Sequence, residues 1–352
     1  MAPVTDRSVA FAFDIDGVLV KGKKPLPGAR DAIQLLQEKH VPFMFLTNGG
    51  GFTEEAHVAR LGKRLGLSTL SPQQFVQSHT PYLDLVPVYR EKTVLVLGGH
   101  GQQIRNLAHA YGFNHVVTSS DVVASFKHIH PFSEMTRAHH DEHGHQHQDL
   151  RATPISAIMC WSSPRDWCLD LQLIQDLLLS KGGVLGTVSP KNGDATLENN
   201  GYLQDGQPQL FFCNPDFEWC TEHEQPRFAQ GAFHEACAGI WKRKTGTELE
   251  YTMFGKPSEA TYLYAENVLR EYGKSMNLSR GIDTVYMIGD NPESDVDGAN
   301  SFRSRHGVEW KSVLVETGVY VPGSIPKHQP YHTVKDVMEA VEWALTKEGG
   351  LN

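Results

Sequence analysis

Residues 9–20 read VAFAFDIDGVLV, and this stretch decides the fold. Five apolar, β-prone residues lead into Asp14, Asp16 and Gly17, a pattern typical of a buried strand that ends in a tight turn. A helical pattern, ARDAIQLLQEKH, comes next, and a second strand-like run, VPFMFLTN, ends at Asn48. The order strand, helix, strand predicts a parallel sheet with a right-handed crossover.

The same alternation returns near the C-terminus. FGKPS at 254–258 leads into a helical pattern, TVYMIGD ends a strand-like run at Asp290, and WKSVLVET supplies another such run at 310–317. Polar side chains gather where these runs end, and ligands bind open α/β sheets at the carboxyl ends of their strands. The sequence therefore predicts an α/β protein with a Rossmann-like parallel-sheet core and a ligand site at that edge.

Residues 81–210 carry a further set of strand and helix patterns, which predicts a second α/β unit inserted into a core formed by 1–80 and 211–352. Inside this insert, residues 127–150 contain seven histidines and few large apolar side chains. Histidine tracts can bind zinc, copper or nickel, but this spacing matches no ordered metal site. We therefore expect an exposed, mobile loop.

The charge balance is acidic, with 32 Lys and Arg against 41 Asp and Glu and a formal net charge of −9. This balance argues against nucleic acid or an anionic membrane as the main partner, but it is compatible with a small anionic substrate. No apolar run is long enough to cross a bilayer, so membrane insertion is not expected. Five cysteines without C-x-x-C spacing and an N-terminus without a signal pattern favour reduced thiols and a cytoplasmic location.

The pair Asp14 and Asp16 offers the groups that phosphate-ester hydrolysis needs. That reaction requires a nucleophile, a proton donor for the leaving oxygen, and cations that neutralise the phosphoryl charge. The two carboxylates can supply the nucleophile and the acid. Taken alone, an acidic turn after a strand is the plainer interpretation of this tetrapeptide.

Three further motifs supply what the pair lacks. Thr47 and Asn48 end the second strand-like run with a hydroxyl and an amide suited to phosphate oxygens. Lys256 places a cation just before a helix, where anions are already favoured. GDNPESD brings Asp290 and Asp295 at a spacing suited to a hard, oxygen-ligated cation such as Mg²⁺. Together these motifs predict a Mg²⁺-dependent phosphohydrolase in which one of the two carboxylates is the nucleophile.

FDIDGVLV, LTNGG, GKP and GDNPESD resemble the four motifs of the haloacid dehalogenase (HAD) superfamily of phosphatases. An insert between the second and third motifs resembles the class IIA, NagD-like arrangement with a C2 cap, and the NPD at 214–216 supports that subclass. QSHTPY, SSPRDWCLDLQ and SVLVETGVYVPG resemble its cat-eye-syndrome-critical-region branch. The resemblance covers nearly the whole chain apart from the histidine-rich segment.

The resemblance implies a role for each acidic residue. Asp14 attacks phosphorus and becomes an aspartyl-phosphate, while Asp16 protonates the leaving oxygen and then activates water. Mg²⁺ is held by the Asp14 carboxylate, the Asp16 backbone carbonyl and Asp290, with Asp295 in its outer coordination sphere.

The resemblance also implies phosphate and substrate contacts. Thr47 and Lys256 hold the transferring phosphoryl group, and Asn48 adds a hydrogen bond. Asp216 lies near the hinge between cap and core and near the active site, although a simple Asx-Pro turn also explains it. Three cap residues could either face the substrate or begin a helix: Arg165, Asp166 and Trp167. Trp161 is expected in the core.

The main prediction is therefore a phosphatase acting on a small phosphorylated metabolite that no residue identifies. A dehalogenase would leave Asp16 and Asp290 idle. A phosphomutase would share all four motifs, and a binding or scaffold protein with a HAD shell would be expected to lose one of them. The family resemblance adds a mitochondrial location as an alternative and is compatible with a homodimer.

Overall fold

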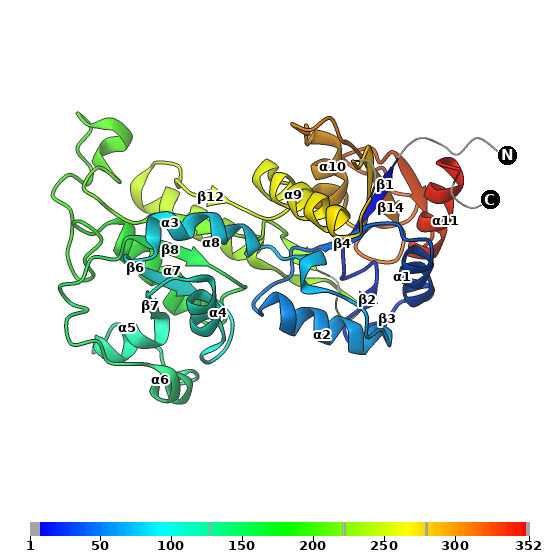
Figure 1. The fold of residues 1–352 in the computed structure, drawn as a ribbon. Coiled ribbons are helices and arrows are strands. Elements are labelled where there is room, and N and C mark those ends of the chain that lie inside the picture. The colour runs from blue at the N-terminus through cyan, green and yellow to red at the C-terminus, as the bar shows by residue number, and fades with distance from the viewer. Residues whose placement is uncertain (1–7, 127, 220, 222, 279–280, 350–352) are drawn as a thin grey trace. The chain divides into compact units, whose positions relative to one another are not determined.

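The computed structural model describes residues 8–126, 128–219, 221, 223–278 and 281–349. The chain forms two compact units (Figure 1). Unit 1 comprises residues 1–80, 218–228 and 254–352, and unit 2 comprises residues 81–217 and 229–253.

Unit 2 begins at the residue where the sequence predicted an insert, but it extends well past residue 210. Strand β9 (Gln209–Phe212) lies inside its sheet, and helix α8 (Gln230–Thr245) packs Phe233 and Trp241 into its core. The chain returns to unit 1 for good only at Phe254. The predicted return at 211 therefore falls within a strand of unit 2, because the core of that unit needs α8 to cover its sheet.

Unit 1 is built on a six-stranded sheet in which all neighbouring strands are parallel, as the strand–helix alternation predicted. In spatial order the strands are β15 (His332–Val334), β14 (Glu309–Val315), β13 (Thr284–Gly289), β1 (Val9–Phe13), β4 (Phe43–Leu46) and β5 (Phe75–Val76). Two antiparallel ribbons complete the unit's strands: β2 (Val20–Lys21) with β3 (Lys24–Pro25), and β10 (Glu218–Trp219) with β11 (Arg227–Phe228).

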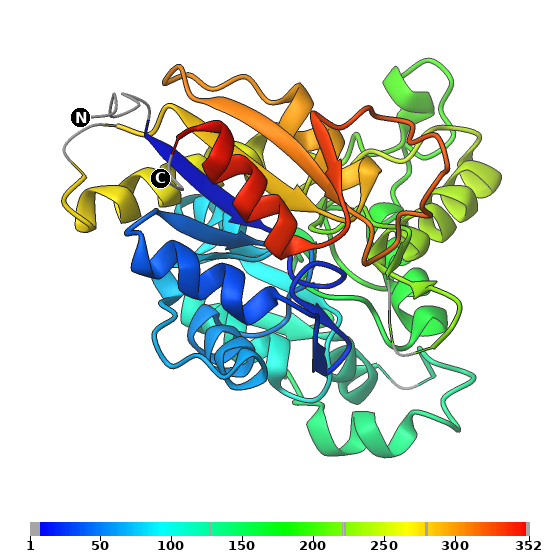
Figure 2. The same cartoon turned by 90° about the vertical axis from the view of Figure 1, so that its right-hand side faces the viewer.

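Alternation along β1 gives this sheet two different faces. Phe11 and Phe13 point into one apolar cluster, and Ala10 and Ala12 point into another on the opposite face. The first cluster is covered by α1 (Ala29–Glu38), α2 (Glu54–Leu65) and α11 (Val337–Lys347), and the second by α9 (Glu259–Ser275) and α10 (Asp297–Ser301). Figure 2 shows α1 and α11 side by side on their face. The α/β prediction is confirmed.

Unit 2 contains a second parallel sheet, of five strands. In spatial order these are β12 (Thr252–Met253), β9, β8 (Ala157–Cys160), β6 (Thr93–Leu97) and β7 (His115–Thr118). Its remaining helices are α3 (Val86–Tyr89), α4 (Gln103–Tyr111), α5 (Ser119–Ser125), α6 (Arg137–His143) and α7 (Trp167–Leu178). Trp161 is fully buried against Tyr82, Tyr111 and Phe113, as a core residue should be.

Many of the residues described between 127 and 150 are exposed, as predicted, but the segment is not a plain loop; Lys127 lies outside the described residues. The segment includes α6, and its His140 is only 4% exposed. The anchor is Asp121, a fully buried carboxylate whose Oδ1 accepts hydrogen bonds from Arg105 Nη2 at 2.6 Å and His145 N at 2.7 Å. Composition alone missed these contacts because they depend on a carboxylate from another helix.

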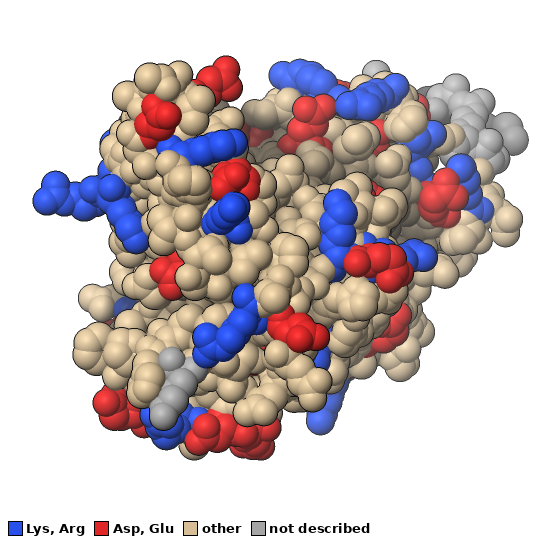
Figure 3. Space-filling view, turned by 90° about the vertical axis from the view of Figure 1, so that its left-hand side faces the viewer, with Lys and Arg blue, Asp and Glu red and all other residues tan. Residues whose placement is uncertain are grey.

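The surface shown in Figure 3 carries Lys and Arg side chains interspersed with Asp and Glu rather than gathered by sign. Among the described residues, no helix has both the length and the apolar character to cross a membrane. Cys160, Cys168, Cys213 and Cys237 are thiols rather than disulfides, while Cys220 lies outside the described residues.

Candidate active site

The turn after β1 brings both of its carboxylates to the edge of the unit 1 sheet. Asp14 N still donates to Ile288 O of β13 at 2.9 Å, so its backbone continues the sheet. The chain then turns at Gly17, whose φ of +88° suits glycine and whose N–H donates to Val20 O at 2.8 Å. Asp16 therefore sits on the turn itself, beyond the end of the strand.

Lys256 is the cation at the centre of the site. Its side chain is 1% exposed, and its Nζ lies 2.9 Å from Asp14 Oδ1 and 2.6 Å from Asp295 Oδ1. Burial by itself disfavours the ammonium, but Asp14 and then Asp295 raise the pKa of Lys256 above its ordinary value. The side chain is therefore held charged between two carboxylates that come from opposite ends of the sequence.

Asn48 holds the backbone of Lys256. Its Nδ2 donates to Lys256 O at 2.9 Å, and its Oδ1 accepts from Lys256 N at 2.7 Å. The nitrogen and the oxygen of the Asn48 amide thus both form hydrogen bonds with the backbone of a residue 208 positions away. The sequence predicted a phosphate contact for Asn48, whereas these hydrogen bonds give it a definite part in positioning the lysine.

Asp290 and Asp295 follow β13 and are nearly fully buried. Asp290 Oδ2 accepts from Val319 N at 2.7 Å, and Asp295 Oδ2 accepts from Asn291 N at 3.0 Å. The loop after β14 passes so close that a Cβ on Gly318 would lie 1.8 Å from Asp290 Oδ2. Glycine at 318 is therefore required for Asp290 to keep its place.

The carboxylates of Asp14, Asp290 and Asp295 form a group suited to a hard divalent cation. Each offers an oxygen, and the three oxygens lie within 4.8 Å of one another. Burial, then Asp14 and Asp295, raise the pKa of Asp290 well above its usual range, and burial raises that of Asp295 to about 6 although Lys256 opposes the shift. One lysine does not balance this much buried negative charge, and an all-oxygen donor set fits Mg²⁺.

Asp16 and Thr47 both lie close to Gly49. A Cβ on Gly49 would be 3.3 Å from Thr47 Oγ1 and 3.9 Å from Asp16 Oδ2, and Thr47 Oγ1 accepts from Gly49 N at 3.0 Å. Burial, with a further contribution from Asp14, raises the pKa of Asp16 to about 7. A carboxyl group with that pKa can both give and take a proton near neutral pH.

The structure therefore brings together in unit 1 all the predicted site residues except Asp216, which belongs to unit 2. Asp216 N donates to Asn214 Oδ1 at 2.7 Å, which is the Asx turn considered as its alternative. In the cap, Asp166 Oδ1 accepts from Leu169 N at 3.0 Å at the start of α7, and Trp167 packs on Phe233. These contacts fit the helix-start interpretation.

Sequence reasoning missed two contributors to the site. Arg64 of α2 acts electrostatically on Asp16 and lowers its pKa, against the larger effect of burial. The loop at 317–319 holds Asp290 through Val319 N and leaves room for it at Gly318. A basic residue late in a helix and a glycine after a strand are too common to be recognised as site residues, so no signal in the sequence pointed to either.

Gly318→Ala should disturb the cation site without removing any functional group, because the added Cβ would displace the Asp290 carboxylate. Loss of such support typically weakens metal binding about 10–100-fold, and we expect a rise of that size in the Mg²⁺ concentration for half-maximal activity. Gly239→Ala is the matched control, since a Cβ there meets no atom within 4 Å. An unchanged Mg²⁺ titration for Gly318→Ala would contradict the packing described.

The sheet, its catalytic edge and the four motifs define a hydrolase of the HAD type, and comparison with known families agrees. Residues 11–114 match the haloacid dehalogenase-like hydrolase family, and residues 253–340 match a HAD-hydrolase-like family. The chain belongs to the haloacid dehalogenase-like hydrolases. The resemblance predicted from the motifs is confirmed.

Two curated relatives match nearly all of this chain. Mitochondrial hydrolase YKR070W of Saccharomyces cerevisiae is 35% identical, with 97% of each chain covered. A Schizosaccharomyces pombe protein described as a cardiolipin synthase (CMP-forming) and mitochondrial hydrolase fusion is 39% identical over 98% of this chain, which spans only 54% of that relative.

Among solved structures, p-nitrophenyl phosphatase from Archaeoglobus fulgidus has the same fold. Its TM-score is 0.60 at 17% identity, with 96% of this chain and 99% of that one covered.

Proposed function

We propose that this chain is a Mg²⁺-dependent phosphatase that hydrolyses a small phosphorylated metabolite through an aspartyl-phosphate on Asp14. The observation that carries the proposal is the placement of Lys256 Nζ, 2.9 Å from Asp14 Oδ1 and 2.6 Å from Asp295 Oδ1, beside the Asp290 carboxylate. A partly buried carboxylate nucleophile beside a fixed cation and a group of oxygen ligands is what phosphoryl transfer requires.

In the first half of the reaction, a carboxylate oxygen of Asp14 forms a bond to phosphorus as the ester P–O bond breaks. The leaving oxygen takes the proton of Asp16, whose pKa near 7 leaves it partly protonated at neutral pH. In the second half, Asp16 accepts a proton from water as that water attacks phosphorus, and the bond between phosphorus and the Asp14 oxygen breaks to restore the Asp14 carboxylate. Inorganic phosphate leaves, and both carboxyl groups return to their starting states.

The remaining residues position the reacting groups and neutralise the phosphoryl charge. Lys256 offsets phosphoryl charge and forms an ion pair with Asp14, while Asn48 fixes the lysine backbone. Thr47, 3% exposed beside Asp16, offers its hydroxyl to phosphate oxygens. Asp14, Asp290 and the backbone carbonyl of Asp16 would hold Mg²⁺, with Asp295 in the outer sphere, and the bound ion would offset charge on the phosphoryl oxygens.

In this proposal, unit 2 is the C2 cap and determines which substrate is accepted. Both relatives are described as mitochondrial hydrolases, and we extend that location to this chain. Fluorescence microscopy of the tagged protein in cells would test the location, and a purely cytoplasmic signal would rule it out.

The activity is tested by release of phosphate from p-nitrophenyl phosphate and from a panel of phosphorylated metabolites. We expect turnover that stops when metal is removed by a chelator and returns with Mg²⁺, because the donor set is all oxygen. Product analysis separates hydrolysis from phosphoryl transfer within the substrate, since a mutase would form an isomer and no free phosphate. Absence of turnover on every substrate, with Mg²⁺ present, would instead favour a binding protein.

A further inference from the structure

The histidine-rich segment brings a second set of metal-ligand groups together in unit 2, separate from the carboxylates of unit 1. His130 Nε2 lies 2.8 Å from Asp166 Oδ2, and His140 Nε2 lies 3.6 Å from the same oxygen. Both imidazoles are at least nine-tenths buried, and the ligand atoms of the three residues all lie within 4.8 Å of one another. Two nitrogens thus converge on one carboxylate oxygen.

From this convergence we propose that His130, His140 and Asp166 form a binding site for a divalent transition-metal ion of the zinc class. Two imidazoles and one carboxylate are a donor set that suits Zn²⁺ and does not suit Mg²⁺. Tetrahedral bonds of about 2.1 Å place the ligand atoms of zinc roughly 3.4 Å apart. The two nitrogen–oxygen separations lie on either side of that value, so small side-chain shifts bring the set to bonding geometry.

Hydrogen bonding among the described residues accounts for only one of the two ring nitrogens of His140. Its Nδ1 is 3.0 Å from Ser120 Oγ, but its Nε2 has no hydrogen-bond partner within the described part of the chain. With Nδ1 protonated and donating to Ser120, the Nε2 lone pair faces Asp166.

Hydrogen bonds from neighbouring groups orient the proposed ligands, as they do in established metal sites. Asp166 keeps its Oδ1 on Leu169 N at the start of α7, so only Oδ2 is directed at the histidines. Thr136 Oγ1 donates to that Oδ2 at 2.9 Å and orients it. Hydrogen bonds of this kind around the ligands fix ring and carboxylate orientation and strengthen binding.

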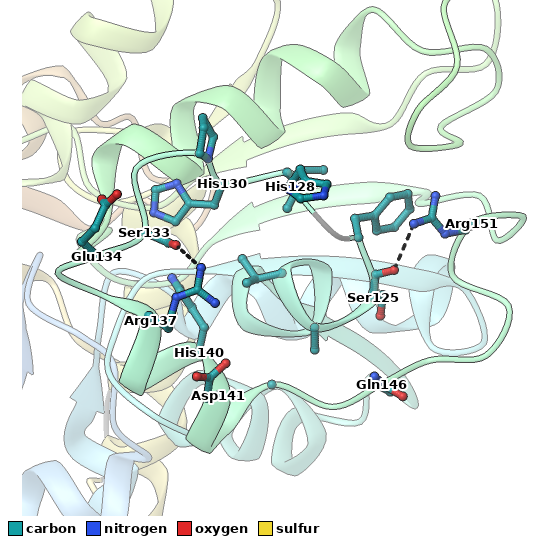
Figure 4. A pocket seen from close by; sticks show the side chains of 16 residues that line it. Ser125, His128, His130, Ser133, Glu134, Arg137, His140, Asp141, Gln146 and Arg151 are labelled. Carbon is teal, nitrogen blue, oxygen red and sulfur yellow. Dashed lines mark hydrogen bonds between the residues drawn. The ribbon is translucent and has the colours of Figure 1, made fainter.

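Metal ions can reach the site from a cavity. His130 and His140 are among the residues that line a cavity of about 810 Å³, together with Ser133, Arg137 and Arg151 (Figure 4). Three protein ligands leave a coordination position for water, and the cavity can supply it. A bound ion would tie the segment around α6 to the first turn of α7.

A second histidine group on α6 provides an internal comparison. His139 and His143 lie on this helix with His100 nearby, and their ligand nitrogens are also within 4.8 Å of one another. This triad is more exposed, with an imidazole at every corner and no carboxylate. The proposal assigns the metal to the buried His130, His140 and Asp166 set, so substitutions in the two groups should have different effects.

The test measures zinc binding by calorimetry on protein purified without a histidine tag, stripped of metal and kept in excess Mg²⁺ to occupy the carboxylate site. We expect one Zn²⁺ per chain at this site and a higher Tm with zinc present. His130→Gln with His140→Gln should weaken this binding by more than the roughly 100-fold that loss of a supporting partner can cost. His139→Gln with His143→Gln, an equal loss of imidazoles from α6 and its surroundings, should leave it unchanged.

Asp166→Asn separates loss of a metal ligand from unfolding of the segment. Asparagine caps a helix as well as aspartate does, but it lacks the carboxylate charge. It should retain the circular-dichroism spectrum and lose affinity. In the cobalt-substituted protein, visible d–d bands should appear in wild type and vanish in the His130/His140 variant. No zinc binding by wild type would overturn the proposal, as would loss in the His139/His143 pair alone or equally in both pairs. Because none of these residues belongs to unit 1, the outcome is independent of the phosphatase assay.

Discussion

Replacing Asp14 with asparagine should lower kcat for phosphate release by roughly 10⁴-fold or more, which is the scale on which loss of a nucleophile acts. The amide is nearly the same size but cannot form the aspartyl-phosphate. The protein should remain folded, because Lys256 keeps its ion pair with Asp295 at 2.6 Å. The measurement is steady-state hydrolysis of p-nitrophenyl phosphate with saturating Mg²⁺.

Asp31→Asn is the matched control for this change. It also converts an aspartate of unit 1 to asparagine, but Asp31 lies exposed in the first turn of α1, away from the carboxylate group. Its kcat should equal that of wild type. If Asp14→Asn were as active as wild type, Asp14 would not be the nucleophile, whatever the function of the site.

Lys256→Gln should have the second largest effect, on both catalysis and stability. Loss of a preorganised charge at a reacting phosphoryl group costs about 10²–10³ in kcat. Removing one partner of a buried ion pair also leaves the other charge uncompensated, typically at about 3–5 kcal/mol in the free energy of unfolding. Asp14 and Asp295 would both lose the ammonium that now lies within 2.9 Å. Denaturant unfolding and kcat measure the two effects separately.

Lys274→Gln tests whether burial, rather than a short contact, gives Lys256 its importance. Lys274 Nζ lies 2.6 Å from Glu271 Oε1, as close as Lys256 is to Asp295, but that pair is exposed to solvent. Water screens such pairs, so its unfolding midpoint should stay close to wild type. Equal stability of the two lysine variants would show that the buried charges are neutralised in another way.

The stretch VAFAFDIDGVLV at residues 9–20 shows how much local sequence could predict. The apolar run VAFAF predicts a buried strand, and Asp14 follows it because a strand that ends at a sheet edge delivers its next residue to that edge. The same reasoning placed Thr47 after β4, Asp290 after β13 and Lys256 before α9. These predictions needed only short-range periodicity and the rule that parallel strands share an edge.

Other features depend on residues far apart in the chain. No pattern near Asn48 indicates that its amide binds the peptide of Lys256, and no pattern near Gly318 indicates that its missing side chain makes room for Asp290. The histidine-rich segment is the clearest case. Its composition predicted a mobile loop, yet Asp121 and Asp166, from elsewhere in unit 2, bind it.

By itself, then, the sequence determined the parallel-sheet core, the order of its elements and the acidic and basic residues at the carboxyl ends of its strands. Those properties follow from hydrogen bonding and burial patterns that repeat over a few residues. Only the tertiary structure decided how far unit 2 extends, what holds Lys256 and Asp290 in place, and that two histidines converge on Asp166. Each of these depends on packing between residues distant in the chain, and such packing leaves no periodic pattern in either partner.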